Sequence, residues 1–161
     1  MSDKTKSCDM ITYRKIIMNT LCRSETLAVL LQGAKETSQA DTLPYKRIFP
    51  YEYLPDALTE ADRFLCFELS TTVNSKNSIY HDTVISFYIL GHKAAIPYTE
   101  EGNHCLWYDK AACELDTLFN DQNTLGIGKI TLISNVPYRS QTSLTGRILT
   151  FKIKSFSKGI T

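Results

Sequence analysis

Residues 108–134 read YDKAACELDTLFNDQNTLGIGKITLIS and carry the clearest structural pattern in the chain. Apolar residues recur there at the three- and four-residue spacing of an amphipathic helix, which we expect over Tyr108–Asn120. Gly126 and Gly128 then permit a tight turn into a strand over Ile130–Ser134. The order helix, turn, strand is the reverse of a phosphate-binding loop, so we expect these glycines to be structural.

Three further segments have the composition and alternation of strands: Phe64–Val73, His81–Leu90 and Arg147–Ile153. A cluster of turn-forming residues at 74–78 separates the first two and predicts an antiparallel hairpin. The strand at 81–90 is apolar enough to be covered on both faces. The polar segment 135–146 is expected to be a loop.

The first third of the chain predicts two helices and an extended connection. Thr12 is a candidate N-cap for the first helix, and Ser24 for a short second helix that Gly33 can end. Residues 34–42 lack an apolar stripe and are expected to form a loop. Prolines within residues 43–55 exclude a helix or a central strand there, so we expect an ordered, extended segment.

These elements predict a single α+β domain in the order α-β-β-α-β-β, with about four mainly antiparallel strands packed by helices. A chain of 161 residues can bury one core without disulfide or metal support. We expect residues 1–11 to be a flexible N-terminus, 12–156 to be the domain and 157–161 to be a C-terminal tail. The predicted core residues are Val84, Phe87, Ile89, Leu115, Leu118, Ile130, Leu132, Leu149 and Phe151.

Overall composition excludes several classes of protein. A net charge of +1 argues against a protein that coats nucleic acid electrostatically. The chain shows no signal peptide and no apolar run of the length that spans a membrane. The five cysteines are an odd number without a CxxC pair, which indicates reduced thiols and cytosolic folding.

The sequence offers no recognisable catalytic or metal-binding motif. Four side chains of metal-ligand type could converge if strand and loop ends meet: His81, His92, His104 and Cys105. They lack a recognised zinc spacing, so we expect the histidines to be solvated loop residues instead. No serine lies in a Gly-x-Ser-x-Gly motif. Glu68 and Asp82, on neighbouring predicted strands, are the one acidic pair that could hold Mg²⁺ for a nuclease, although acidic residues are also common on solvent-facing strands. We therefore expect no enzyme activity and no cofactor.

Two surfaces are candidates for binding. Arg147, Lys152 and Lys154, followed by Lys158, could form a cationic face that lines a passage for DNA. The favoured alternative is that these charges keep an exposed edge strand soluble and prevent it from pairing with other strands. The aromatic residues of the proline-rich segment suit either a protein interface or packing onto their own domain. These residues are Tyr45, Phe49, Tyr51 and Tyr53.

The chain resembles the tail terminator, or tail completion, proteins of long-tailed bacteriophages and prophages. The similarity extends over roughly residues 12–156 and rests on the order of the elements and on four sequences. These are the helix at 108–120, LGIGKI at 125–130, GRILTF at 146–151 and IFPYEYLP at 48–55.

The resemblance implies a structural virion protein that forms a ring, usually a hexamer. Such a ring caps the tail tube, ends its elongation and offers the head-tail joining surface of the neck. The implied partners are other copies of the chain, the tail tube protein, a head-tail connector or stopper and, in a contractile tail, the sheath protein. DNA would only pass through the lumen, and no membrane or cofactor is implied. The expected location is the tail or neck of the virion, after assembly in the bacterial host cytoplasm.

The same resemblance suggests where contacts lie. We expect a loop at residues 94–103 to be poorly ordered in the isolated subunit and to order on the tail tube. The expected interface residues are Tyr45, Phe49, Tyr51, Tyr53, Pro97, Tyr98, Glu100, Glu101, Asp109 and Glu114. The expected lumen or DNA-facing residues are Arg147, Lys152 and Lys154. The alternatives are a connector or stopper of the neck, a phage-encoded nucleic-acid-processing enzyme and a monomeric adaptor.

Overall fold

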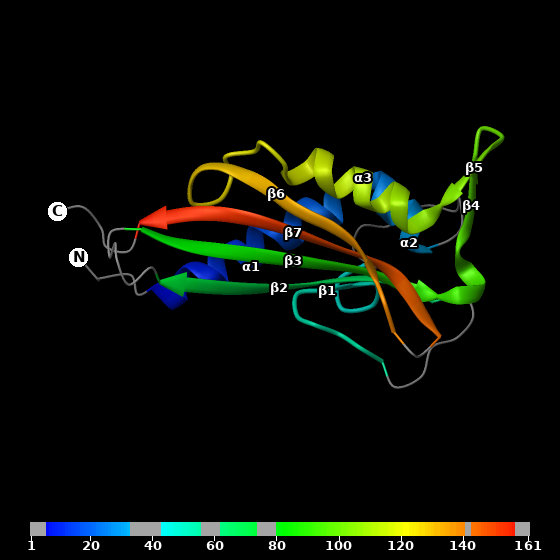
Figure 1. Cartoon of the computed structure of the whole chain (residues 1–161), viewed down its shortest axis with the longest axis horizontal. Coiled ribbons are helices and arrows are strands. Elements are labelled where there is room, and N and C mark those ends of the chain that lie inside the picture. The colour runs from blue at the N-terminus through cyan, green and yellow to red at the C-terminus, as the bar shows by residue number, and fades with distance from the viewer. Residues whose placement is uncertain (1–5, 33–42, 56–61, 74–79, 141–142, 157–161) are drawn as a thin grey trace.

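A computed structural model describes residues 6–32, 43–55, 62–73, 80–140 and 143–156 (Figure 1). These residues form a single α+β domain with a five-stranded sheet and a separate two-stranded hairpin. The predicted fold class, a mainly antiparallel sheet packed by helices, is confirmed. The sheet order is β1-β2-β3-β7-β6.

The helices are α1 (Lys6–Arg23), α2 (Glu25–Gln32) and α3 (Trp107–Phe119), with a 3-10 turn η2 (Lys93–Ala95). The strands of the main sheet are β1 (Ile48–Phe49), β2 (Arg63–Val73), β3 (Tyr80–His92), β6 (Ile127–Tyr138) and β7 (Leu144–Phe156). The hairpin consists of β4 (Pro97–Glu100) and β5 (Asn103–Leu106).

Strand pairing agrees with the predicted hairpin of β2 and β3. These strands are antiparallel, with Phe67 opposite Phe87, and β3 in turn pairs with β7, where Leu149 lies opposite Phe87. The predicted turn at 74–78 lies outside the described residues. The two-residue strand β1 runs parallel to β2 and is an addition to the four predicted strands.

The main core lies between the helices and one face of the sheet. Side chains of α1, α2 and α3 pack there against alternate residues of β2, β3 and β7. Phe87 is at the centre, with its ring centroid 5.0 Å from that of Phe119 and 5.7 Å from that of Phe151. Such aromatic pairs add roughly 0.5–1.5 kcal/mol each beyond their buried area. The core is therefore built from elements far apart in the sequence.

Most of the predicted core is confirmed. Six of the nine predicted side chains are buried: Phe87, Ile89, Leu115, Ile130, Leu149 and Phe151. Val84, Leu118 and Leu132 are half-buried instead. Val84 differs because it pairs with Lys152 on the opposite face of the sheet, where no helix covers it among the described residues.

A second, smaller cluster lies on that opposite face. Phe49, at the end of β1, packs edge-on against Phe64 of β2 with ring centroids 6.2 Å apart. Tyr53 stacks on Phe49 with centroids 3.9 Å apart. Burial raises the pKa of the neighbouring Cys66 to about 11. Residues 48–55 are therefore extended, as predicted, and cover one end of this face. Residues 43–47 instead form a turn, in which the Arg47 N–H donates to the Leu43 carbonyl at 2.9 Å.

The two strands at the C-terminus are longer than predicted. Residues 135–138 belong to β6 and residues 144–146 to β7, so the predicted loop at 135–146 is too long at both ends. β6 is an edge strand, and its polar residues face solvent rather than forming a loop. Its pairing with β7 shifts register between Ile127 and Thr131 and again between Leu132 and Ser134.

The first helix begins earlier than predicted. α1 starts at Lys6 rather than after a cap at Thr12, so residues 6–11 are helical and not a flexible terminus. Asp9 in the first turn is favourably placed relative to the helix dipole. Ser24 caps α2 as predicted, because its Oγ accepts a hydrogen bond from the backbone N–H of Leu27 at 3.2 Å.

The predicted loop at residues 94–103 is also wrong, because it contains η2 and most of a β-hairpin. Thr99 pairs with His104, and Glu100 with Asn103, so Glu101 and Gly102 form a two-residue turn. Both have positive φ, 50° and 80°, as the tight turns of β-hairpins require. In Figure 1 this hairpin projects beyond the end of the main sheet.

Candidate protein-interaction surfaces

The histidines do not assemble into a metal site. His81 and His92 lie at opposite ends of β3, about 36 Å apart at 3.3 Å per residue. His81 is buried, so its expected solvation is wrong. His92 accepts a hydrogen bond from the Ala94 N–H at 3.1 Å and caps η2. Within the described residues, no three His, Cys, Asp or Glu side chains are grouped as metal ligands.

The candidate acidic pair is separated as well. Asp82 lies opposite Thr72, four positions beyond Glu68 on β2, which corresponds to about 13 Å. Each carboxylate has its own cation: Glu68 pairs with Arg14, and Asp82 with Lys152 at 2.8 Å. Burial opposes ionisation of Glu68, but hydrogen bonds from the Leu69 N–H and from Arg14 hold its pKa below the ordinary value. The two groups therefore act in separate ion pairs.

The basic residues of β7 do not share one face. Arg147 lies on the helix-covered face, where its Nε donates to Asp109 Oδ1 at 2.6 Å. Successive side chains of a strand point to alternate faces of the sheet. Lys152 and Lys154 therefore share the opposite face, five and seven positions from Arg147. β7 is also an interior strand between β3 and β6, so the predicted edge strand is wrong. Lys158 lies outside the described residues.

Lys152 and Lys154 are both an odd number of positions from Arg147 along β7. Both lysines therefore point away from the face that Arg147 shares with Leu149 and Phe151. A single cationic surface made of all three residues is wrong. The two lysines alone remain on one face, and Lys152 is partly neutralised by Asp82.

Two predicted interface residues of α3 hold the domain together. Asp109 forms the ion pair with Arg147, and Glu114 accepts a 2.7 Å hydrogen bond from Ser24 Oγ. These contacts connect α3 to β7 and to the start of α2. Both acidic side chains therefore have structural partners within the domain.

The four aromatic residues of the proline-rich segment divide into two pairs. Phe49 is buried, and Tyr53 stacks on it, so these two pack onto their own domain. Tyr45 and Tyr51 remain 64% and 43% exposed. Tyr45 has a φ of 58°, which is unusual for a bulky residue, and its N–H donates to the Ile48 carbonyl at 2.8 Å.

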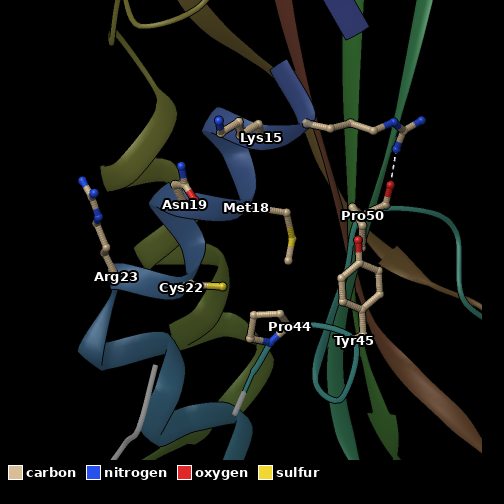
Figure 2. A pocket seen from close by; sticks show the side chains of 9 residues that line it. Lys15, Met18, Asn19, Cys22, Arg23, Pro44, Tyr45 and Pro50 are labelled. Atoms are coloured by element: carbon tan, nitrogen blue, oxygen red, sulfur yellow. Dashed lines mark hydrogen bonds between the residues drawn. The ribbon is translucent and has the colours of Figure 1, made fainter. Parts of the chain in front are cut away.

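Tyr45 lies at the edge of a groove between α1 and the segment that leads into β1. We call this the α1 groove; its volume is about 610 Å³. It is lined by Arg14, Lys15, Met18, Asn19, Cys22, Arg23, Pro44, Tyr45 and Pro50. Figure 2 shows Met18 and Cys22 projecting from α1 toward Pro44 and Tyr45. Burial raises the pKa of the Cys22 thiol, which therefore stays neutral.

The rim of the α1 groove is cationic. Lys15, Asn19 and Arg23 are exposed and follow one another at four-residue intervals along α1. The third cation, Arg14, binds Glu68 and the Pro50 carbonyl. Lys15 and Arg23 have no ion-pair partner among the described residues. The groove thus combines an apolar wall with two available positive charges.

Sequence reasoning did not single out this groove. Its two walls come from segments about twenty residues apart, and their approach depends on the tertiary structure. One signal was present: the i, i+4, i+8 spacing of Lys15, Asn19 and Arg23 places these polar groups on one side of a helix.

The β4–β5 hairpin is a second exposed surface, and its charge is opposite. Residues 97–106 contain Glu100 and Glu101 but no lysine or arginine. Both glutamates are exposed; Glu100 forms a 2.8 Å ion pair with Lys110 of α3. Hydrogen bonding and the negative charge of Glu100 raise the pKa of Lys110.

The base of the hairpin is fixed to the core by Arg63. Its guanidinium donates to the Leu30 carbonyl at 3.0 Å and to the Ala95 carbonyl at 2.9 Å. It also lies over the Trp107 ring, 5.2 Å from the centroid. Tyr98 packs against the main core from β4. The hairpin therefore leaves the domain in a defined direction.

These features describe a single-domain α+β protein with two exposed surfaces of opposite charge. The sequence profile of the YomW family matches residues 24–153, which is most of the chain, and the chain belongs to this family. The family is associated with Bacillus phages and prophages, so the protein is phage-related. No curated protein matches the chain. Within the described residues, no helix has the length and apolar character needed to cross a membrane.

Proposed function

We propose that the protein is a tail terminator: a structural subunit of a hexameric ring that caps the tail tube and ends its elongation. The ring would also present the head-tail joining surface of the neck. The observation that carries this proposal is the projecting β4–β5 hairpin on a domain of a phage-associated family. An anchored projection of this kind suits contact with another chain.

Ring formation provides the physical reason. A ring of identical subunits needs two different patches per subunit that meet head to tail. The hairpin and the α1 groove come from different elements and have opposite charge. Both features support a subunit that contacts its neighbours through unlike surfaces.

The proposed partners are the tail tube protein, a head-tail connector or stopper and, if the tail is contractile, the sheath protein. DNA would pass through the lumen without sequence-specific contact. The proposed location is the neck or tail of the virion.

We further propose that the protein has no enzymatic turnover. Support comes from the candidate catalytic groups, which have structural partners: Glu68 binds Arg14, Asp82 binds Lys152, and His92 caps η2. Purified protein is expected to leave DNA intact in the presence of Mg²⁺. Hydrolysis that disappears in Glu68→Ala or Asp82→Ala protein would overturn this part of the proposal.

The main experiment removes the gene from the phage and examines the particles by electron microscopy. A tail terminator predicts tails of uncontrolled length and unjoined heads, with recovery when the gene is supplied in trans. Tails of normal length that fail to join heads would instead indicate a connector or stopper. Normal particles would contradict both roles.

A further inference from the structure

The tip of the β4–β5 hairpin carries an unusual residue for its backbone conformation. Glu101 occupies the first central position of the turn with a φ of 50°, where asparagine, aspartate or glycine is preferred. A non-glycine residue in this conformation is locally unfavourable. The local turn therefore does not explain a glutamate there.

The carboxylate of Glu101 is also available for an external contact. Its side chain is exposed, and it has no ion-pair partner among the described residues, whereas Glu100 is bound to Lys110. A single free negative charge thus lies at the end of an anchored projection. A partner surface for this tip should offer positive charge beside apolar groups.

The α1 groove has that chemistry. Lys15 and Arg23 supply two available cations, and Met18 with Tyr45 supplies apolar surface. Among the described residues, no acidic side chain lines the groove. Its volume of about 610 Å³ lies within the ordinary range of 300–1,000 Å³ for ligand-binding pockets.

The hairpin does not reach the α1 groove of the same chain. Figure 1 places the hairpin at one end of the molecule, whereas α1 runs along the opposite half of the sheet. The base of the hairpin is held by Arg63, so its direction is fixed. A complementary contact between these surfaces therefore requires a second copy of the chain.

We propose that the tip of the β4–β5 hairpin of one copy inserts into the α1 groove of the next copy, with Glu101 against Lys15 and Arg23. This contact rests on the proposed ring and identifies the two patches that meet in it. Because the two patches differ, each copy can donate one hairpin and accept another. The exposed ion pairs should make association weaker as salt concentration rises.

The test uses two complementary charge-reversal variants. Glu101→Lys alters the hairpin and leaves the groove intact, and Lys15→Glu with Arg23→Glu does the reverse. Each variant alone is expected to self-associate at least about tenfold more weakly than the unchanged chain. Mixed together, they are expected to associate again, because the lysine of one variant meets the glutamates of the other. Light scattering and sedimentation velocity measure both results.

Matched controls separate charge from folding. Arg139→Glu reverses another exposed positive charge and should leave association unchanged. Glu101→Asn introduces a residue suited to the turn and removes the charge, so it should weaken association while the hairpin persists. Circular dichroism melting checks that every variant remains folded.

Several outcomes would overturn the contact: an unchanged chain that stays monomeric, charge variants that associate normally, or a mixture that fails to recover. The particle assay separates this failure from failure of the proposed function. If gene deletion gives overlong tails but both charge variants restore normal ones, the tail terminator role stands and this contact is wrong. If deletion leaves normal particles, the proposed function fails regardless of how the purified chains associate.

Discussion

The main core and the β4–β5 hairpin differ in the interactions that hold them in place. In the core, large apolar side chains from three helices and the sheet are fully buried around Phe87. In the hairpin, most side chains are exposed, and order comes from backbone pairing and from Arg63 at the base. The comparison indicates that stability resides in the core, whereas the hairpin is available for contact.

The largest expected effect tests the core. Leu115→Ala removes a fully buried side chain of α3 and should lower the free energy of unfolding by about 2–5 kcal/mol. Leu118→Ala, on the same helix but half-buried, is the matched control and should cost clearly less. Chemical denaturation measures both. Equal costs for the two variants would contradict the described packing of α3.

The next effect tests the junction between the two regions. Arg63→Met removes the donors to the carbonyls of Leu30 and Ala95, and should cost about 1.5–3 kcal/mol for the loss of charged hydrogen bonds. Hydrogen exchange in residues 97–106 should also increase, because the base of the hairpin is no longer fixed. An unchanged exchange rate there would show that Arg63 does not anchor the hairpin.

A smaller effect tests the contact between helices. Ser24→Ala removes the cap of α2 and the hydrogen bond to Glu114, and should cost roughly 0.5–2 kcal/mol. Thr20→Ala is a useful control, since its hydroxyl bonds only to the Ile16 carbonyl within α1 among the interactions described. Thermal melting compares the two variants, and an equal loss would argue against a special role for the cap.

The smallest effect has the opposite sign. Glu101→Asn places a favoured residue in the turn and should stabilise the hairpin by up to about 1 kcal/mol, with little change in the core. NMR chemical shifts of residues 97–106 report the hairpin population. A less populated hairpin would mean that the glutamate itself stabilises the turn.

The same contrast explains what the sequence could predict. β2, β3 and α3 have long periodic apolar patterns, so their positions followed from local chemistry. The hairpin was missed because Pro97 and Glu101 are poor strand and turn signals; Pro97 is tolerated at the first position of a strand. The groove depends on tertiary contact between α1 and residues 44–50, which no local pattern contains.

The distribution of basic residues over the two faces of β7 follows from their positions alone. Arg147 and Lys152 are five positions apart in a single strand, and this odd difference places them on opposite faces. The full length of β6 could not be predicted in the same way. Its polar residues resemble a loop in the sequence, and only their pairing with β7 shows that they form a strand.

The irregular pairing of the edge strand β6 bears on edge-to-edge aggregation. An exposed, regular edge would allow one copy to extend the sheet of another without limit. β6 has two register shifts, and Pro137 lacks a backbone N–H to donate. These irregularities disfavour uncontrolled stacking of sheets through backbone hydrogen bonds, which would otherwise compete with the ring contact proposed above.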